Sequence, residues 1–459
     1  MSLHPAGAST AAPLPPSPPG TPLLGHMRVL RKDPLTFLQA QVRQYGDVVR
    51  VHIGPASLVV VAHPDGVRHV LQDQARRYGK RTRGFAALRE LLGHGLLTSE
   101  GSFWLRQRRL AQPAFHRQRL AGFARTMVDA ASDLASELES RADAGVAFNV
   151  AEDCMRLTLR IASATLFGQD VSGAWHDIAD AMGRVQVFTY KRLTQALPIP
   201  RRLPLPTHRR FERDTHTLDR VVRGIIETRR RDTGEHHDLL QMMLEQHDAD
   251  TGERMSDTQL RDEVLTMLLA GHETTANALS WTFMLLSQHP SVRREVEAEL
   301  AHALGGRAPT DEDLPRLALT RRVVDESLRL YPPAWSLSRV AVEDDVIGGF
   351  RIPKGTYLLL SPWVTHRHPR VWDNPEGFDP DRFLPEHEQE RPRFAWFPFG
   401  GGPRQCIGNQ FALMELVLVL ATVLQRVRLN LTPGQVIRPA AAITLRPRPG
   451  VWVTATRVR

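Results

Sequence analysis

A cysteine follows a run of glycines near the carboxyl end of this 459-residue chain. The segment reads Phe399-Gly400-Gly401-Gly402-Pro403-Arg404-Gln405-Cys406-Ile407-Gly408. The apolar stretch that follows predicts a buried helix from Asn409 onward. Backbone N–H groups and the dipole at the start of a helix favour a thiolate over a thiol. Cys406 is therefore predicted to act as a metal ligand or as a nucleophile.

The residues around Cys406 separate these two chemistries. A nucleophilic thiol, as in a cysteine hydrolase, needs a positioned base such as His, and the segment contains none. A structural zinc site needs about four Cys or His ligands, but the other cysteine, Cys154, lies far away among Met155 and Leu157 and is predicted to be a core residue. Iron in a haem matches the ligand count, because the porphyrin supplies four ligands and a thiolate the fifth. A buried structural cysteine remains the alternative for Cys406.

The pattern Phe-x-x-Gly-x-Arg-x-Cys-x-Gly, read as Phe399, Gly402, Arg404, Cys406 and Gly408, resembles the haem-binding signature of the cytochrome P450 superfamily of haem-thiolate monooxygenases. The resemblance implies haem b, iron protoporphyrin IX, with Cys406 as the iron ligand and with Phe399, Arg404 and Gly408 beside it. It also implies the family fold, which is mainly α with a small β part: a triangular helical domain plus a small β-rich region. Further family motifs extend the resemblance over nearly the whole chain.

A patch of small and polar residues interrupts the long apolar helix predicted over Val264–Leu286. Ala270 would let a flat cofactor approach, and Thr274 can donate to the carbonyl of Ala270 and bend the helix. The patch resembles the family's oxygen-activation motif, which implies Thr274 as the residue that handles dioxygen and Glu273 as the acid that feeds protons through water. His272 is expected to pack within the helices rather than to face the iron.

Two more motifs resemble structural and cofactor-binding parts of the family. Glu326 and Arg329 are three residues apart on a predicted helix, and Arg382 lies in a Pro-Asp-Arg-Phe segment. By resemblance this trio holds the irregular segment that leads to the cysteine loop. Trp104 and Arg108 resemble the Trp-x-x-x-Arg motif, whose indole N–H and guanidinium bind a haem propionate.

The resemblance also implies the remaining ligand contacts. Arg339 and Arg404 match propionate-binding positions, and Arg404 stands where many relatives have His. The residues expected to face the substrate are mostly apolar: Phe85, Leu88, Ala270, Ala334, Trp335, Leu337 and Leu445. Such a cavity suits a fatty acid, a terpenoid, a steroid or a macrolide-like molecule. The basic residues Lys191, Arg192, Arg201 and Arg202 either attract a substrate carboxylate or form a solvated surface.

The activity implied is insertion of one oxygen atom of dioxygen into a hydrophobic substrate, by hydroxylation or epoxidation, while the other atom leaves as water. The chain carries no flavin, nicotinamide or iron–sulfur motif, so electrons are expected from a ferredoxin or flavodoxin with its NAD(P)H reductase. Such an acidic donor would dock near Arg106 and Arg109. A peroxide-dependent peroxygenase and a non-catalytic haem sensor are the alternatives, and the Glu273–Thr274 pair argues against both.

Helices and short strands must position these groups. A helix is predicted over Pro34–Tyr45, followed by a hairpin of Val48–Ile53 and Leu58–Ala62, and the pattern is then helical from Trp104 to about Ala301. Short strands are predicted at Val340–Val342, Phe350–Ile352 and Tyr357–Leu360. We expect a Pro-rich flexible lead over residues 1–25 and a single haem domain over 26–459.

Composition restricts the remaining possibilities. The chain is 42% hydrophobic and 24% charged, as in globular proteins, and its 59 Lys and Arg exceed its 50 Asp and Glu by 9. The motifs place several of those arginines at the haem and the donor face, so nucleic acid is not an expected partner. Residues 1–30 contain no apolar run, so neither a signal peptide nor a membrane anchor is expected. A cytoplasmic monomer is expected.

Overall fold

The computed structural model describes residues 12–169, 175–193, 195, 199–236, 238–245, 247 and 252–458. Its α-helices are α1 (Met27–Lys32), α2 (Pro34–Tyr45), α3 (Pro64–Arg68), α4 (Arg83–Leu92), α5 (Gly101–Ala111), α6 (Arg117–Ala144), α7 (Val150–Phe167), α8 (Trp175–Leu193), α9 (Pro206–Arg231), α10 (Leu239–Glu245), α11 (Asp257–Gln288), α12 (Pro290–Leu304), α13 (Ala318–Leu330), α14 (Pro362–Thr365), α15 (Pro385–Glu390) and α16 (Asn409–Leu424). Shorter turns of helix are η1 (His69–Asp73), η2 (Ala75–Arg77), η3 (Gln112–Phe115), η5 (Asp311–Arg316), η6 (Pro380–Phe383) and η7 (Gly402–Arg404). The strands are β1 (Val48–Ile53), β2 (Ala56–Val61), β3 (Tyr78–Gly79), β4 (Phe148–Asn149), β5 (Leu337–Ala341), β6 (Asp345–Ile347), β7 (Phe350–Ile352), β8 (Tyr357–Leu360), β9 (Val427–Leu431), β10 (Arg438–Ala441), β11 (Leu445–Arg448) and β12 (Trp452–Arg457).

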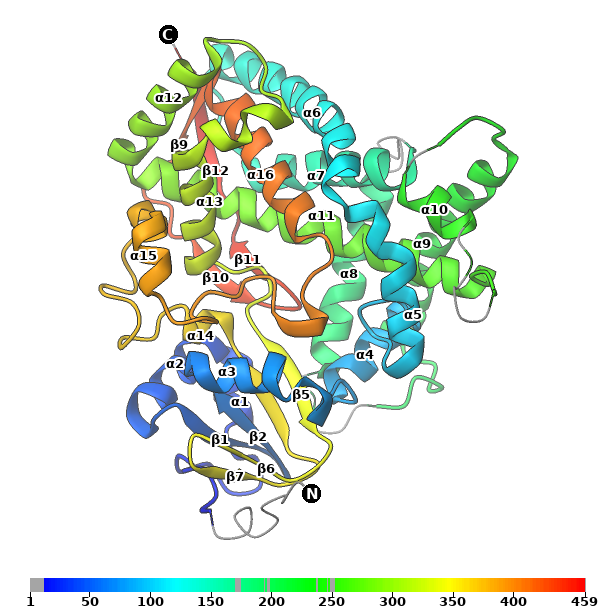
Figure 1. Cartoon of the computed structure of the whole chain (residues 1–459), viewed down its shortest axis with the longest axis vertical. Coiled ribbons are helices and arrows are strands. Elements are labelled where there is room, and N and C mark those ends of the chain that lie inside the picture. The colour runs from blue at the N-terminus through cyan, green and yellow to red at the C-terminus, as the bar shows by residue number, and fades with distance from the viewer. Residues whose placement is uncertain are drawn as a thin grey trace, which may run out of the picture.

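The helices and the main sheet occupy different parts of the molecule. Figure 1 shows helices filling most of the view, with the sheet and helices α1 to α3 gathered at the bottom. The main sheet has five strands in the order β1-β2-β8-β5-β3. Three smaller sheets are formed by β4-β12-β9, by β6-β7 and by the β10–β11 hairpin. This confirms the expected class, mainly α with a small β part.

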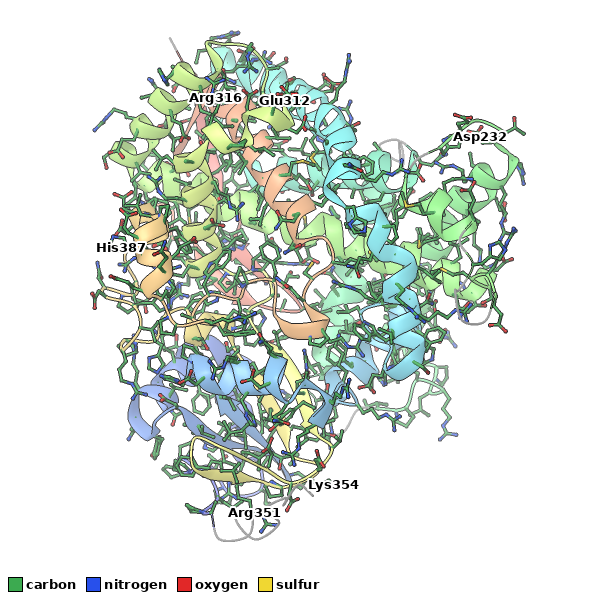
Figure 2. All side chains as sticks on the ribbon, in the orientation of Figure 1. Asp232, Glu312, Arg316, Arg351, Lys354 and His387 are labelled. Carbon is green, nitrogen blue, oxygen red and sulfur yellow. The ribbon has the colours of Figure 1, made fainter. Side chains whose placement is uncertain are left out.

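Helix α11 runs through the centre of the helical part (Figure 1) and packs against α7, α13 and α16. It begins at a capping box in which Ser256 Oγ accepts from the N–H of Gln259 and Gln259 Oε1 accepts from the N–H of Ser256. From Leu260 to Leu286 nearly every residue is buried, as expected of a helix that is apolar on all sides. Charged side chains such as Asp232, Glu312 and Lys354 project at the periphery instead (Figure 2).

Local sequence signals place the first elements correctly. Asp33 caps α2 by accepting from the N–H of Thr36, and the helix covers Pro34–Tyr45 as predicted. The predicted hairpin forms from β1 and β2, which pair antiparallel across Gly54. The predicted strand near Val340 begins earlier, at Leu337, because β5 pairs along its length with β8.

The Pro-rich lead was expected to be flexible, but its described part lies against the sheets. The carbonyl of Pro16 accepts from the N–H of Arg50, and that of Pro13 from the N–H of Arg351. These bonds attach the lead at Pro13 and Pro16, whereas residues 1–11 lie outside the described part.

None of the described helices combines the length and the apolar character that crossing a bilayer requires.

Candidate functional site

The cysteine loop is built on η7 and ends at the start of α16. The N–H of Cys406 donates to the carbonyl of Phe399 at 2.9 Å, which closes the loop. Gly402 has a φ of +64°, and a Cβ there would lie 1.8 Å from the carbonyl oxygen of Leu71 in η1. Gly402, part of the cysteine pattern, is therefore needed for packing against the protein's own backbone. At Gly408, a Cβ would make only an ordinary contact with Phe115.

Cys406 is exposed as a residue, although the protein around its thiol is dense enough to disfavour the charged form. Burial raises the pKa of this thiol, and the N–H of Gly408 together with the positive charge of Arg108 only partly offset that effect. In the protein without a bound metal, burial therefore opposes the thiolate that the start of the helix favours. A metal ion would reverse the balance, because a coordinating thiol loses its proton. Cys154, in contrast, is fully buried in the main core cluster, as predicted.

Helix α11 has a stretch of accessible surface between buried turns, called here the opening of α11. Ala270 is exposed and Thr274 half-exposed, although the neighbouring turns of the helix are buried. Thr274 Oγ1 donates to the carbonyl of Ala270 at 2.5 Å, the back-bond that the sequence predicted. His272 lies on the buried side, where its carbonyl accepts from Thr158 of α7. Burial lowers the pKa of its imidazole to about 4.

Three cations gather beside the cysteine loop. Lys80 and Arg339 are buried, and Arg404 is half-buried. Burial lowers the pKa of Arg339 and that of Arg404 to about 10, and repulsion from Arg339 contributes at Arg404. Burial and the charges of both arginines hold the pKa of Lys80 well below its usual range. The acidic side chain that opposes these effects is Glu100, so positive charge is in excess here and suits a ligand with two carboxylates.

The predicted propionate motif is assembled around Trp104. The guanidinium carbon of Arg404 lies 3.8 Å from the centroid of the Trp104 ring, and Arg404 Nη1 donates to the carbonyl of Ser99 at 2.8 Å. Arg108 Nη1 donates to the carbonyl of Gln405 at 2.9 Å, directly before the cysteine. Helix α5 and the cysteine loop are thereby held together. Lys80 was not found from the sequence, since it belongs to no motif and only the fold brings it here.

The trio Glu326, Arg329 and Arg382 also comes together. Arg329 pairs with both oxygens of Glu326, and Arg382 Nε lies 3.6 Å from Glu326 Oε1. The side chains of Glu326 and Arg329 are completely buried, so this pair differs from the exposed ion pairs that add little to stability. Arg329 also donates to the carbonyls of Pro375 and Gly377, which places it under the irregular segment.

Glu273 does not face the same way as Thr274. It is buried, and its carboxylate accepts from Gln186 of α8 and from Thr444 and Arg446 of the β10–β11 hairpin. Gln186 and Arg446 had no sequence signal, because they are far from Glu273 along the chain and belong to no motif.

The predicted substrate residues divide into two groups. Leu88, Ala270, Ala334 and Leu337 keep accessible surface, and Phe85 is nearly buried beside Lys80. Trp335 and Leu445 belong to a buried cluster under the main sheet instead. Trp335 Nε1 donates to the carbonyl of Ala442, and Leu445 has no accessible surface. In this conformation Leu445 has no surface for a substrate to touch, and Trp335 keeps about as little as Phe85.

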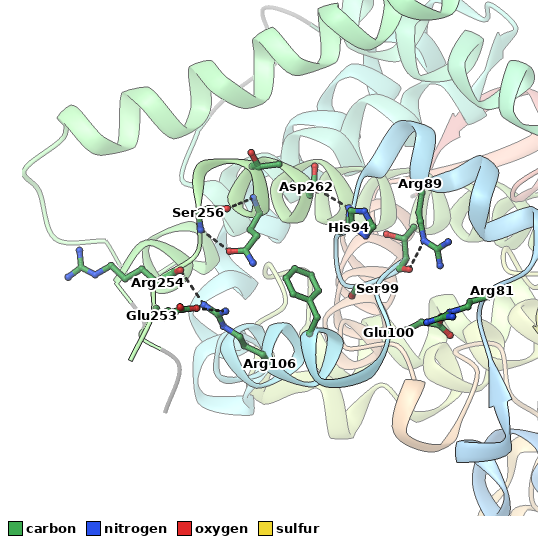
Figure 3. Close-up of a pocket in the computed structure, with 14 residues that line it drawn as sticks. Arg81, Arg89, His94, Ser99, Glu100, Arg106, Glu253, Arg254, Ser256 and Asp262 are labelled. Atoms are coloured by element: carbon green, nitrogen blue, oxygen red, sulfur yellow. Dashed lines mark hydrogen bonds and ion pairs between the residues drawn. The ribbon is translucent and has the colours of Figure 1, made fainter. Parts of the chain in front are cut away.

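Some of the basic residues predicted at the pocket mouth and on the donor face form ion pairs with carboxylates of the protein. Arg192 Nη2 lies 2.9 Å from Glu90 of α4, and Arg201 lies 3.7 Å from the same carboxylate. Arg106, expected on the donor face, pairs with Glu253 at 3.1 Å. Arg106 and Glu253 line a cleft of about 940 Å³ between α4, α5 and the start of α11 (Figure 3).

The loop between α4 and α5 is held to the start of α11. Asp262 Oδ2 accepts from the N–H of His94 at 2.7 Å, which Figure 3 draws, and Glu263 Oε2 accepts from the N–H of Leu96 at 3.0 Å. A Cβ at Gly95 would lie 2.2 Å from Thr266 Oγ1, so the loop fits closely on α11. Neither Thr274 nor Cys406 lines the cleft, so it is separate from the predicted reaction site.

Comparison with known proteins identifies the family. The cytochrome P450 family model matches residues 15–453. The chain is 38% identical over 438 residues to cyclooctatin synthase of Streptomyces melanosporofaciens, with 94% of each protein covered. It is 39% identical over 419 residues to cyclooctat-9-en-7-ol 5-monooxygenase of the same organism, with 91% of this chain and 90% of that protein covered.

A third relative and a solved structure extend the comparison. Pentalenene oxygenase of Streptomyces avermitilis is 34% identical over 451 residues, with 97% of this chain and 96% of that protein covered. The crystal structure of the cytochrome P450DA heme domain matches with a TM-score of 0.88 at 31% identity, over 98% of both chains. The enclosed thiol, the opening in α11 and the excess of cations all fit the haem that these relatives imply. The protein belongs to the cytochrome P450 family and is a haem b monooxygenase.

Proposed function

We propose that this protein hydroxylates or epoxidises a hydrophobic terpenoid, using dioxygen and electrons from separate redox proteins. The observation that supports this best is the opening of Ala270 and Thr274 in the middle of the buried helix α11, together with the enclosed thiol of Cys406. One oxygen atom enters the substrate and the other leaves as water, so each turnover consumes two electrons and two protons.

The side chains have distinct tasks in this proposal. Haem held by Cys406 supplies an iron centre whose thiolate ligand favours O–O cleavage. Lys80, Arg339 and Arg404 bind its carboxylates through charge-assisted hydrogen bonds. Thr274 Oγ1 hydrogen-bonds at the opening of α11, and Glu273 supplies the protons.

A terpenoid is favoured over the other substrate classes that an apolar cavity admits. Relatives that align over most of this chain are named for cyclooctatin, cyclooctat-9-en-7-ol and pentalenene. Arg192 and Arg201, two of the four basic residues that could bind a fatty-acid carboxylate, both pair with Glu90. Leu88, Ala334 and Leu337 offer apolar surface to a hydrocarbon.

The electron donor is proposed to be a ferredoxin or flavodoxin with its NAD(P)H reductase, acting on a cytoplasmic monomer. The exposed basic residues Arg109 and Arg119 support an acidic donor near α5 and α6. Arg109 also interacts with other groups of the protein.

A substrate-induced spin-shift screen tests the substrate class. The purified haem protein is titrated with pentalenene and other cyclic terpenes, with palmitate and with a steroid. We expect the terpenes to shift the Soret band to the high-spin position and palmitate to leave it unchanged. A shift with palmitate alone would contradict the terpenoid assignment.

Turnover assays distinguish the two alternative functions. Product formation from pentalenene is compared with NADH plus a ferredoxin and its reductase, and with hydrogen peroxide alone. Equal rates would favour a peroxygenase, and no consumption of NADH with any ligand would favour a haem sensor. We expect product with redox partners and much slower turnover with peroxide.

A further inference from the structure

The cleft between α4, α5 and the start of α11 is large enough to bind a small molecule of its own. Its volume of about 940 Å³ lies within the range of about 300–1,000 Å³ that is usual for ligand pockets. Its walls are fixed, because the N–H groups of His94 and Leu96 bind the loop after α4 to the carboxylates of Asp262 and Glu263. A ligand therefore meets a preformed surface and orders little of the protein when it binds.

Guanidinium groups outnumber carboxylates among the described residues that line this cleft. The four arginines are Arg81, Arg89, Arg106 and Arg254, and the three acids are Glu100, Glu253 and Asp262. Each acid already pairs with an arginine, at 2.9 to 3.3 Å. Arg89 pairs with no carboxylate of the described residues, and its Nε donates to the carbonyl of Thr98 at 3.2 Å. The cleft therefore suits a ligand that brings a negative charge.

One end of the cleft is the best place for that charge. Figure 3 shows Arg81, Arg89 and Glu100 together at this end. The side chain of Arg81 is 86% exposed and its pair with Glu100 measures 3.3 Å, so this pair is a weak one that a ligand can replace. The planar guanidinium groups of Arg81 and Arg89 match the geometry of a carboxylate.

The ring of Phe103 adds a flat apolar surface to the cleft. Phe103 is half-exposed on α5, and the other described side chains that line the cleft are polar or charged. A planar ring of a ligand can stack on this one, which favours an aromatic molecule over an aliphatic one of the same charge. The neutral terpenoid proposed as the substrate lacks that charge, so a different molecule is expected here.

Residues 97–100 connect the cleft with the cations beside the cysteine loop. Three consecutive carbonyls of this segment each accept from a cation: that of Leu97 from Lys80 Nζ at 2.9 Å, that of Thr98 from Arg89 Nε at 3.2 Å, and that of Ser99 from Arg404 Nη1 at 2.8 Å. One short segment therefore binds a cation of the cleft and two of the cations assigned to the haem carboxylates.

Charges in the cleft also act on those cations directly. Burial is the main reason that the pKa of Lys80 lies well below its usual range, and Arg89 lowers this pKa further while Glu100 opposes the effect. An anion bound to Arg89 would add negative charge within reach of the same group. Because reduction of a haem iron adds an electron, added negative charge nearby favours the ferric state.

We propose that this cleft binds an aromatic carboxylate, with the carboxylate between Arg81 and Arg89 and the ring against Phe103, and that the bound ligand lowers the reduction potential of the haem. By linkage, the same ligand binds the ferric protein more tightly than the ferrous protein. Neither Cys406 nor Thr274 lines the cleft. The inference is therefore independent of which substrate is oxidised.

The first test measures binding of 2-naphthoate to the haem-loaded ferric protein by equilibrium dialysis. Saturating 4-phenylimidazole is present, so that the space above the iron is already filled. We expect one naphthoate per chain. Methyl 2-naphthoate lacks the charge and cyclohexanecarboxylate lacks the flat ring, so each should bind about tenfold more weakly. Absence of naphthoate binding, its loss when 4-phenylimidazole is added, or equal binding of either analogue would overturn the proposal.

Variants of the lining residues locate the naphthoate. Arg81→Gln and Arg89→Gln should each weaken binding by about tenfold, and Phe103→Ala by about fivefold. Arg81 is exposed and makes no buried contact that the fold needs, so its variant remains informative if Arg89→Gln is unstable. Arg209→Gln, in an exposed arginine of α9, and Leu105→Ala, in an exposed residue of α5 outside the cleft, are the matched controls and should bind as the parent does. Parent-like binding in all three lining variants would place the naphthoate elsewhere.

A potentiometric titration tests the effect on the haem. The potential of the 4-phenylimidazole complex is measured with and without saturating 2-naphthoate. We expect the ferric protein to bind naphthoate about fivefold more tightly than the ferrous protein, which lowers the potential by ~40 mV for a one-electron couple. Arg89→Gln should show no such shift at the same naphthoate concentration. An unchanged or raised potential in the parent with naphthoate bound would show that the cleft has no influence on the haem, whatever the terpene screen gives.

Discussion

Arg329 donates from Nε to Oε2 of Glu326 at 2.6 Å and from Nη2 to Oε1 at 2.8 Å, and neither side chain has any accessible surface. The same guanidinium donates to the carbonyls of His366, Pro375 and Gly377. One buried arginine therefore ties α13 to the irregular segment that precedes the cysteine loop.

Removing this pair is expected to unfold the region around the cysteine loop. Arg329→Lys loses the bidentate geometry and most of the carbonyl contacts, so we expect a loss of about 3–5 kcal/mol in the free energy of unfolding. Denaturant titration measures it, and reduced haem content should accompany it. Arg322→Lys, on the same helix but in a partly exposed pair with Asp381, should cost less than about 1 kcal/mol. Equal losses in the two variants would contradict this account.

The two cysteines make a matched pair for testing iron ligation. Cys406→Ala should abolish the strongly red-shifted Soret band of the reduced carbon monoxide complex, because that band reports a thiolate ligand. Cys154→Ala should retain it, since Cys154 is a fully buried core residue. Retention of the band in Cys406→Ala would exclude Cys406 as the ligand.

Thr274→Ala tests the role of the opening in α11. The variant should bind haem normally but divert electrons from NADH into hydrogen peroxide, because the hydroxyl that hydrogen-bonds there is lost. Product and peroxide formed per NADH consumed are the measurement, with pentalenene as the first substrate tried. Thr275→Ala, the buried neighbour, serves as the control and should keep the parent ratio. A parent-like ratio in Thr274→Ala would remove its assigned role.

Glu263 makes stability depend on pH. Burial raises the pKa of its carboxyl from the ordinary 4.5 to about 7, and the N–H of Leu96 opposes that shift. Between these values the folded protein keeps a proton that the unfolded chain has released, so stability falls as pH rises, by up to about 3 kcal/mol. Glu263→Gln removes this loss and should melt at a higher temperature than the parent at pH 8, with little difference near pH 4.5.

Thermal melts at both pH values check the Glu263 prediction. The exposed Glu295→Gln is the control and should follow the parent at each pH. A Glu263→Gln protein that is less stable than the parent at pH 8 would show that the carboxyl is not the source of the pH dependence.

Short-range patterns were sufficient for the elements and for the individual motifs. The capped helix at Pro34–Tyr45, the hairpin at Gly54 and the back-bond from Thr274 to Ala270 depend on neighbours within a few residues. Burial was harder to predict. Trp335 and Leu445 were expected to face the substrate, but the fold places both in a core cluster under the main sheet. An apolar side chain is equally favourable in the wall of a cavity and in the core. Residue type alone therefore does not tell which of the two environments a position has.

The sequence by itself predicted the chemistry: a thiol ligand at Cys406, a hydroxyl at Thr274 and an acid at Glu273, each within a local pattern. Tertiary structure decided the environment of these groups. It brought Lys80 to the arginines near the cysteine loop, directed Glu273 toward Arg446 and away from Thr274, and buried the Cys406 thiol enough to raise its pKa. The physical reason is that charge state and orientation depend on desolvation and on partners from distant segments, which only the folded chain brings within a few ångströms.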